Sequence, residues 1–342
     1  MNVNKWTLGL AAAGLVTLPL MVQAEEKLSP VLTALSSTTI SGYVDTSAHW
    51  DFGSGNDNPA PIIYNQRKQD GFNLNRVKLR IEKPLDEAQW SAGYRADLWF
   101  GPDANVLGTQ SLGFGVSDLA IQQAYVALRA PVGNGLDFKM GVFDSIIGYE
   151  SHDNVNNPNY TRSYATGWQP RSHTGLLATY QVFEALGIAA GVANTMGPQI
   201  NNRAQSLAGE AETRKTYMGS IALTVPDSLG FLAGSTIYGG IVDGFANDPS
   251  SEQSNYYLGA TLNTPITGLK VGAAFDYVSD MSITGDGSLF GAGGFIPNVG
   301  DGRSYAGYVS FQATEKLSLH ARGEYSDVWP GQFNLGWGRE KF

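Results

Sequence analysis

Hydrophobic and polar residues alternate along three stretches of the chain, at 40–50, 90–100 and 317–326. Within 90–100, for example, Tyr94, Leu98 and Phe100 alternate with Arg95 and Asp97. A period of two residues is typical of a β-strand with one apolar and one polar face. Each stretch has about eleven residues and ends near an aromatic side chain, as expected for a tilted strand that crosses a membrane.

Weaker alternation predicts further strands at 72–83, 119–130, 135–143, 174–182, 186–195, 213–225, 230–243, 254–264, 268–279 and 303–314. The connections between the predicted strands are alternately short and long. The short ones are 84–88, 131–134, 183–185, 226–229, 265–267 and 315–316, and the long ones are 51–71, 101–118, 144–173, 196–212, 244–253 and 280–302. Short turns at one end and long loops at the other are typical of outer-membrane barrels, with the turns in the periplasm.

The predicted fold is all-β, an antiparallel up-and-down transmembrane β-barrel with about 14 strands, the last of them at 332–338. The chain ends on an aromatic residue, Phe342, but Phe333, Leu335 and Trp337 alternate out of phase with it. If the C-terminus is truncated, we expect about 16 strands, because such barrels have an even number. No domain boundary or linker is evident, and residues 25–342 are predicted to form one barrel domain.

The first 24 residues are predicted to be a secretory signal peptide. Lys5 precedes an apolar stretch at 8–21, and small residues lie before Glu25. That stretch is shorter than the about 20 residues of a membrane-spanning helix. We therefore expect export and location in the cell outer membrane.

Composition narrows the class of protein. The chain has 42 glycines, 11% aromatic residues, 15% charged residues and no cysteine. Abundant glycine and aromatic residues with few charges fit barrel strands with aromatic belts, whereas soluble domains carry about 25% charged residues. The net charge of −9 argues against a nucleic-acid partner, which requires a basic surface.

One wall of the predicted lumen is rich in cations. If Val77, Leu79 and Ile81 face lipid, their neighbours on the same strand face the lumen. The expected pairing places Arg76 opposite Asp97 and Lys78 opposite Arg95. We define the basic wall as the lumen-facing residues Arg76, Lys78, Arg80, Arg95 and Asp97, with Arg322 and Glu324 as further lumen-facing residues. The wall either orients solutes and favours anions, or is ordinary polar lining.

The longest predicted loop, 144–173, is the candidate for a constriction inside the barrel. Its candidate residues are Asp144, Tyr149, Glu150, Asp153, Tyr160, Arg162 and Tyr164. Loops of this length are usually functional or disordered. Folded inward, the loop would narrow the pore and set its acids against the basic wall; the alternative is an external loop with no role in permeation.

Sites for other chemistry are weakly indicated. His320 lies two residues from Ser318 on the same predicted face, but no orienting acid is evident, so we expect no enzyme activity. Asp- and Asn-rich stretches at 51–58 and 153–159 lack the ligand order of a calcium loop. We expect neither a metal site nor a cofactor.

Several long stretches resemble the outer-membrane β-barrel porin family often called porin-L-like. They are SGYVDTSAHW at 41–50, KQDGFNLN at 68–75, EKPLDEAQWSAGYRADLWFGPDAN at 82–105, AYVALRAPVGNGLDFKMGVFDSIIGYE at 124–150 and NPNYTRSY at 157–164. The resemblance covers about residues 38 to 328. It implies a porin in contact with outer-membrane lipid and small hydrophilic solutes; porins are often homotrimers.

Three hypotheses follow. The first is an outer-membrane porin that serves as a passive diffusion channel for small hydrophilic solutes or ions. The second is a non-conducting structural or adhesive barrel whose lumen is filled by side chains. The third is a soluble, secreted β-sandwich.

Overall fold

A computed structural model describes residues 37–50, 71–109, 117–203, 214–245, 252–284, 295–330 and 340–341. The predicted signal peptide, the predicted strand at 332–338 and most of the loop at 51–71 lie outside these residues. No helix among the described residues is long and apolar enough to cross a membrane.

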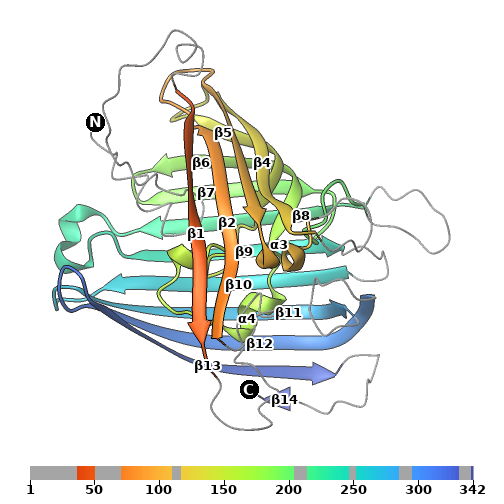
Figure 1. Ribbon diagram of the computed structural model, residues 1–342. Helices are drawn as coiled ribbons and strands as arrows, with labels where there is room; N and C mark the ends of the chain where they lie inside the picture. The colour runs from red at the N-terminus through yellow and green to blue at the C-terminus, as the bar shows by residue number, and fades with distance from the viewer. Residues whose placement is uncertain are drawn as a thin grey trace.

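Within the described residues, fourteen antiparallel strands follow one another in chain order (Figure 1). They are β1 (Thr39–His49), β2 (Gly71–Lys83), β3 (Ala92–Phe100), β4 (Leu119–Ala130), β5 (Leu136–Asp144), β6 (Ser172–Phe183), β7 (Leu186–Ala193), β8 (Thr216–Thr224), β9 (Thr236–Phe245), β10 (Glu252–Asn263), β11 (Leu269–Thr284), β12 (Phe295–Gln312), β13 (Ser318–Pro330) and the two-residue β14 (Glu340–Lys341). The up-and-down order confirms the predicted fold class. Thirteen of the predicted strands are present, and the fourteenth, predicted at 332–338, lies outside the described residues.

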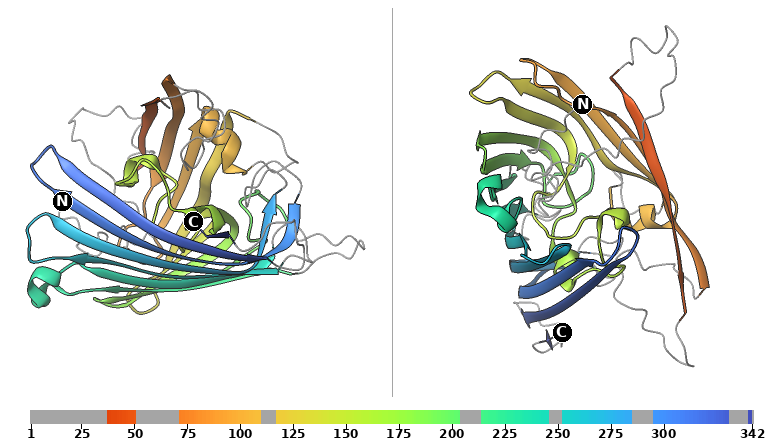
Figure 2. Two further views of the ribbon diagram at one scale, coloured as in Figure 1. Left: turned by 90° about the horizontal axis from the view of Figure 1, so that it is seen from below. Right: turned by 90° about the vertical axis from the view of Figure 1, so that its left-hand side faces the viewer.

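The sheet curves around an interior, as both views in Figure 2 show. Every strand pairs with its neighbours in the sequence, and within the described residues no pairing joins β1 to β13 or β14. We call the space between these two ends of the sheet the seam.

The two faces of the sheet differ as the alternation predicts. On the outer face Leu258 and Ile221 are each 54% exposed, whereas on the inner face Arg76 and Asp97 are fully buried. Exposed aromatic residues lie at both ends of the outer face, with Tyr217 and Tyr256 near the long loops and Trp90, Phe183 and Phe231 at the short turns. An apolar outer face between two aromatic belts is the surface that a bilayer requires.

Two connections in the second half of the chain differ from the prediction. The turn after β8 is longer than expected, because the 3₁₀ helix η2 (Asp227–Leu232) occupies part of the strand predicted at 230–243. Gly230 and Gly234 have positive φ there, so the chain turns until β9 begins at Thr236. Conversely, β11 and β12 extend into the predicted loop at 280–302, with bulges at 278–283.

Among the described residues, three further short elements lie off the sheet. The helix α3 (Pro102–Leu107) follows β3, and the 3₁₀ helix η1 (Asn154–Asn156) and the helix α4 (Tyr164–Trp168) belong to residues 145–171. Figure 2 shows the yellow-green segment between β5 and β6 within the curve of the sheet. We call residues 145–171 the inner loop.

Candidate functional site: the interior of the barrel

Asp97 on β3 is the centre of a charged cluster on the inner face of β2 and β3. Its carboxylate lies 2.9 Å from Lys78 Nζ, 2.8 Å from Arg80 Nε and 2.6 Å from Arg95 Nη2. The Asp97 side chain is fully buried, so these ion pairs are shielded from water. All five residues of the basic wall therefore face the interior, with their cations bound to carboxylates.

The pairing within this cluster differs from the expected one. Arg80 lies opposite Asp97 and Glu82 opposite Arg95, a shift of four residues, and Lys78 faces Trp99. The predicted pairing of Lys78 with Arg95 was wrong because the turn between β2 and β3 is longer than expected. Trp90 has a positive φ, and the Ser91 hydroxyl accepts a hydrogen bond from the Asp86 amide in this turn. The shift replaces a like-charge pair by opposite-charge pairs, which sheets favour.

Arg76 is bound elsewhere. A register shift between Asp45 and Thr46 in the β1–β2 ladder turns Asn75 and Arg76 both inward. Arg76 then lies 2.8 Å from Asp103 of α3, and its guanidinium stacks 3.6 Å from the centre of the Trp99 ring. The helix α3 is thus held against the wall by a buried ion pair and a cation–π contact.

Asp153 of the inner loop docks on the same wall. Its carboxylate is 2.6 Å from Lys78 Nζ and accepts a hydrogen bond from the Tyr43 hydroxyl of β1. Burial raises the pKa of Asp153, but the charge and the hydrogen bond of Lys78, with the charge of Arg76, together outweigh burial and hold this pKa below its usual range. Asp153 is therefore a carboxylate at neutral pH, and Asn154 beside it donates to Asp45 of β1.

Glu150 joins the inner loop to β13. It accepts hydrogen bonds from the Ser163 amide and the Thr166 hydroxyl, and it lies 3.1 Å from Arg322. Arg322 also donates to the backbone carbonyls of Thr161 and Arg162. Beside it, Glu324 accepts from the Tyr164 amide of α4. The two lumen-facing residues predicted on this strand thus contact the inner loop.

The inner loop spans the seam. Asp153 binds β1 and β2, while Glu150, three residues earlier, binds β13. The Cα atoms of residues three apart are at most about 11 Å from each other. One short segment of chain therefore holds the first hairpin and β13 at a fixed separation inside the barrel.

Aromatic packing holds the opposite side of the inner loop. The ring of Tyr149 stacks on Tyr308 of β12 with centroids 4.0 Å apart, and its hydroxyl accepts from Thr261 of β10. Tyr149 lies over Gly272, where a Cβ atom would collide with its hydroxyl. Nearby apolar side chains fill the interior along β5 to β12, namely Phe143, Ile146, Ile147, Leu177, Met196, Met218, Tyr238, Val242, Tyr257 and Tyr308.

The remaining predicted loop residues have different environments. Asp144 lies at the end of β5 and accepts hydrogen bonds from the Gln122 side chain. Arg162 is buried and donates to three backbone carbonyls and to Asn154. Tyr160 and Tyr164 are 48% and 38% exposed. The side chains of these two tyrosines are partly exposed, whereas the charged candidates are hydrogen-bonded or ion-paired.

The sequence prediction omitted Asp45, Asp103 and Gln122, which complete the cluster. Asp45 lies on the polar face of a predicted strand, so alternation could have identified it. Asp103 is in α3, whose signals are Pro102 at the first turn and Gly108, in the left-handed conformation, after the last. Gln122, which joins Lys78 to Trp99, has no sequence signal of its own.

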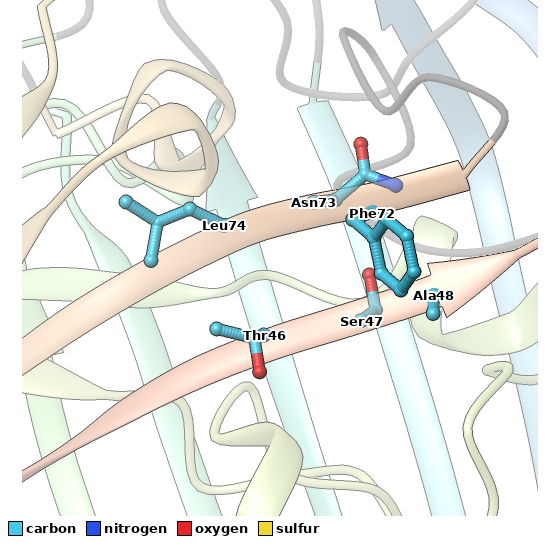
Figure 3. A pocket seen from close by; sticks show the side chains of 6 residues that line it. All are labelled: Thr46, Ser47, Ala48, Phe72, Asn73 and Leu74. Atoms are coloured by element: carbon cyan, nitrogen blue, oxygen red, sulfur yellow. The ribbon is translucent and has the colours of Figure 1, made fainter.

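Two further features lie outside the charged cluster. Both ring nitrogens of His320 face serine hydroxyls, Ser310 at 2.9 Å and Ser318 at 2.8 Å, rather than a carboxylate. A recess along the paired strands β1 and β2 is lined by Thr46, Ser47, Ala48, Phe72, Asn73 and Leu74 (Figure 3). The recess lies on one hairpin and contains no charged side chain.

An apolar outer face, a charged cluster on the inner face of β2 and β3 and an inward-folded loop are typical of an outer-membrane β-barrel channel. The chain matches the family described as "Putative beta-barrel porin-2, OmpL-like" over residues 37–333, and it belongs to this family. It is therefore an outer-membrane channel for solutes. The resemblance inferred from the sequence is confirmed. Comparison with curated proteins found no match.

Solved structures of outer-membrane proteins are similar in fold. The outer membrane channel DcaP of Acinetobacter baumannii is 12% identical, with 85% of this chain and 78% of that chain covered and a TM-score of 0.46. Pseudomonas putida OprB is 12% identical, with 74% and 68% covered and a TM-score of 0.45. An anion-selective porin from Comamonas acidovorans is 11% identical, with 85% and 89% covered and a TM-score of 0.38.

Proposed function

We propose that the protein is a passive diffusion channel for small hydrophilic solutes or ions, and that the inner loop with the basic wall forms its narrowest part. The observation that carries this proposal is the inner loop, bound at Lys78 and at Arg322 across the interior. A loop fixed inside a barrel reduces the cross-section without closing the ends. Polar side chains around it replace part of the hydration of a passing solute.

Conductance in planar bilayers tests the proposal. The purified protein should give discrete single-channel steps at about 1 M KCl. The double variant Glu150→Gln/Asp153→Asn should give larger and noisier steps, because the inner loop loses both ionic anchors. The matched control is Asp137→Asn, which removes a carboxylate paired with Arg129 on β4 and β5, away from the loop.

A folded protein without conductance would contradict the proposal and favour a structural or adhesive barrel. The apolar cluster between the inner loop and β5–β12 is the observation that supports this second candidate, because it fills part of the interior. Folding is verified separately by the change in gel mobility on heating. Assembly as a homotrimer, export by a signal peptide at 1–24 and the absence of enzyme activity stay predictions.

A further inference from the structure

The accessible charges beside the inner loop differ in sign from those of the basic wall. The side chains of Arg76, Lys78 and Arg95 are only 0%, 2% and 5% exposed. Arg80 is 14% exposed, but it forms two hydrogen bonds with Asp97. The basic wall therefore presents little free positive charge to a solute.

The ion pairs also neutralise the wall. Arg76 is paired with Asp103, and Lys78 is paired with both Asp97 and Asp153. Arg95 binds Asp97 and lies 3.8 Å from Glu82. Four wall cations thus share four close carboxylates. Paired opposite charges largely cancel one another's field at a distance, and salt screens what remains beyond about 8–10 Å.

Two partly exposed carboxylates lie at the seam. Asp45 of β1 is 13% exposed, accepts hydrogen bonds from Asn75 and Asn154, and lies 3.8 Å from Arg76, which is already paired with Asp103. Glu324 of β13 is also 13% exposed and shares Arg322 with Glu150. Each carboxylate is thus bound to a cation that a second carboxylate already neutralises.

These carboxylates border the side of the inner loop that is open. Asn154 bonds to Asp45, the amide of Tyr164 bonds to Glu324, and between them Val155 and Tyr160 are 60% and 48% exposed. The other side of the loop is packed against apolar side chains of β5–β12. A solute that passes the loop therefore meets this exposed face and the two seam carboxylates.

We infer that the channel favours cations, and that Asp45 and Glu324 are the residues that set this selectivity. Fixed charges near a narrow passage concentrate counter-ions, and low-dielectric walls strengthen their field. Asp45 and Glu324 each share a cation with a second carboxylate, whereas Arg80, the wall cation of similar exposure, is bound through two nitrogens by Asp97; the two carboxylates therefore act more strongly on a passing ion. The inference rests on the proposed channel activity. It is the opposite of the anion preference that the cations of β2 alone would predict.

Reversal potentials in a KCl gradient test the inference. The wild-type channel should be several-fold more permeable to K⁺ than to Cl⁻, and Asp45→Asn/Glu324→Gln should lower this ratio by about twofold or more. The control Glu184→Gln/Glu315→Gln removes two exposed carboxylates from short turns and should leave the ratio unchanged.

The outcomes separate the two proposals. Absence of any conductance would contradict channel activity itself. A conducting wild type that prefers Cl⁻ or does not discriminate would overturn the inference alone, whether or not the variants fold. An unchanged permeability ratio in a folded, conducting double variant would show that Asp45 and Glu324 do not set the selectivity.

Discussion

At the scale of single residues, the carboxylate of Asp97 neutralises several buried cations in the interior. It is the shared partner of Lys78, Arg80 and Arg95, and it is fully buried. An uncompensated buried cation is costly because it loses its hydration without gaining a partner. The cluster therefore depends on this carboxylate more than on any one of the cations.

Replacing Asp97 by Asn should destabilise the protein by about 3–5 kcal/mol, the cost of removing one member of a buried ion pair. Unfolding by urea in detergent micelles measures the change. Asp137→Asn is the matched control, because the Arg129–Asp137 pair is about a quarter exposed and should contribute at most about 1 kcal/mol. Equal losses for the two variants would contradict a special role for Asp97.

Docking of the inner loop should weaken in acid. Burial, with the charges of Arg171 and Arg162, lowers the pKa of His152 to about 3. A released loop would take up a proton on His152 below about pH 6.5, so the docked state loses stability as pH falls from 6.5 toward 3. Asp153, whose pKa is below its usual range, adds a loss of the same sign below about pH 4.

Protease cleavage within the inner loop at about pH 7.5 and 4.5 measures this dependence, with an acid-tolerant and a neutral protease calibrated on the same peptide. Cleavage should be faster in acid, and His152→Asn should reduce the difference between the two pH values. Equal cleavage of the folded protein at both pH values would contradict the prediction.

Which residues face the interior could be predicted from the sequence, but their partners could not. Alternation placed Arg76, Lys78 and Arg80 on the inner face, because a period of two assigns faces without any knowledge of register. The partners that Lys78 and Arg80 find on β3 depend on the length of the turn after β2. That length follows from Trp90 and Ser91, whose conformations carry no pattern in the sequence.

At the scale of elements, the inner loop is seated on a small surface made by β10, β11 and β12. Gly272 lies between its paired residues Thr261 and Tyr308, and the ring of Tyr149 covers it. A glycine here leaves room for an aromatic ring at the strand surface. The length of the inner loop could be predicted from the sequence. Its packing surface could not, because the contact joins residues more than 100 positions apart in the chain.

Gly272→Val should displace Tyr149 and weaken docking of the inner loop by about 1–3 kcal/mol, the usual cost of an overpacked site. Faster protease cleavage within residues 145–171 at neutral pH would show this. Gly323→Val on β13 is the control, since a Cβ atom there meets nothing within 4 Å. If both variants are cleaved as slowly as the wild type, the stacked tyrosines do not hold the loop.

At the scale of the whole molecule, the outer face sets the position of the barrel in the bilayer. Leu258 lies near the middle of β10, and Leu262 lies on the same face next to the turn end. Arginine should cost about 2–4 kcal/mol at the depth of Leu258 but only about 0–1 kcal/mol at Leu262. The comparison uses one strand, one face and one substitution.

Folding into liposomes, followed by urea unfolding, measures both variants. Equal destabilisation by Leu258→Arg and Leu262→Arg would mean that these positions lie at one depth. That result would contradict the orientation drawn from the aromatic belts.

The class of fold and the strand order could be predicted from alternation and connection lengths, whereas the packed interior depends on contacts far apart in the chain.

The short segment from Glu150 to Asp153 has a consequence for the order of folding. Its contact with Lys78 spans 75 residues of sequence, and its contact with Arg322 spans 172. Contacts between distant parts of a chain form slowly, because closing a long loop costs more entropy. The ion pair of Asp153 with Lys78 can form once the first five strands have formed. The ion pair of Glu150 with Arg322 can form only after the thirteenth strand. The nascent barrel should therefore pass through an intermediate in which the loop is fastened at one end only.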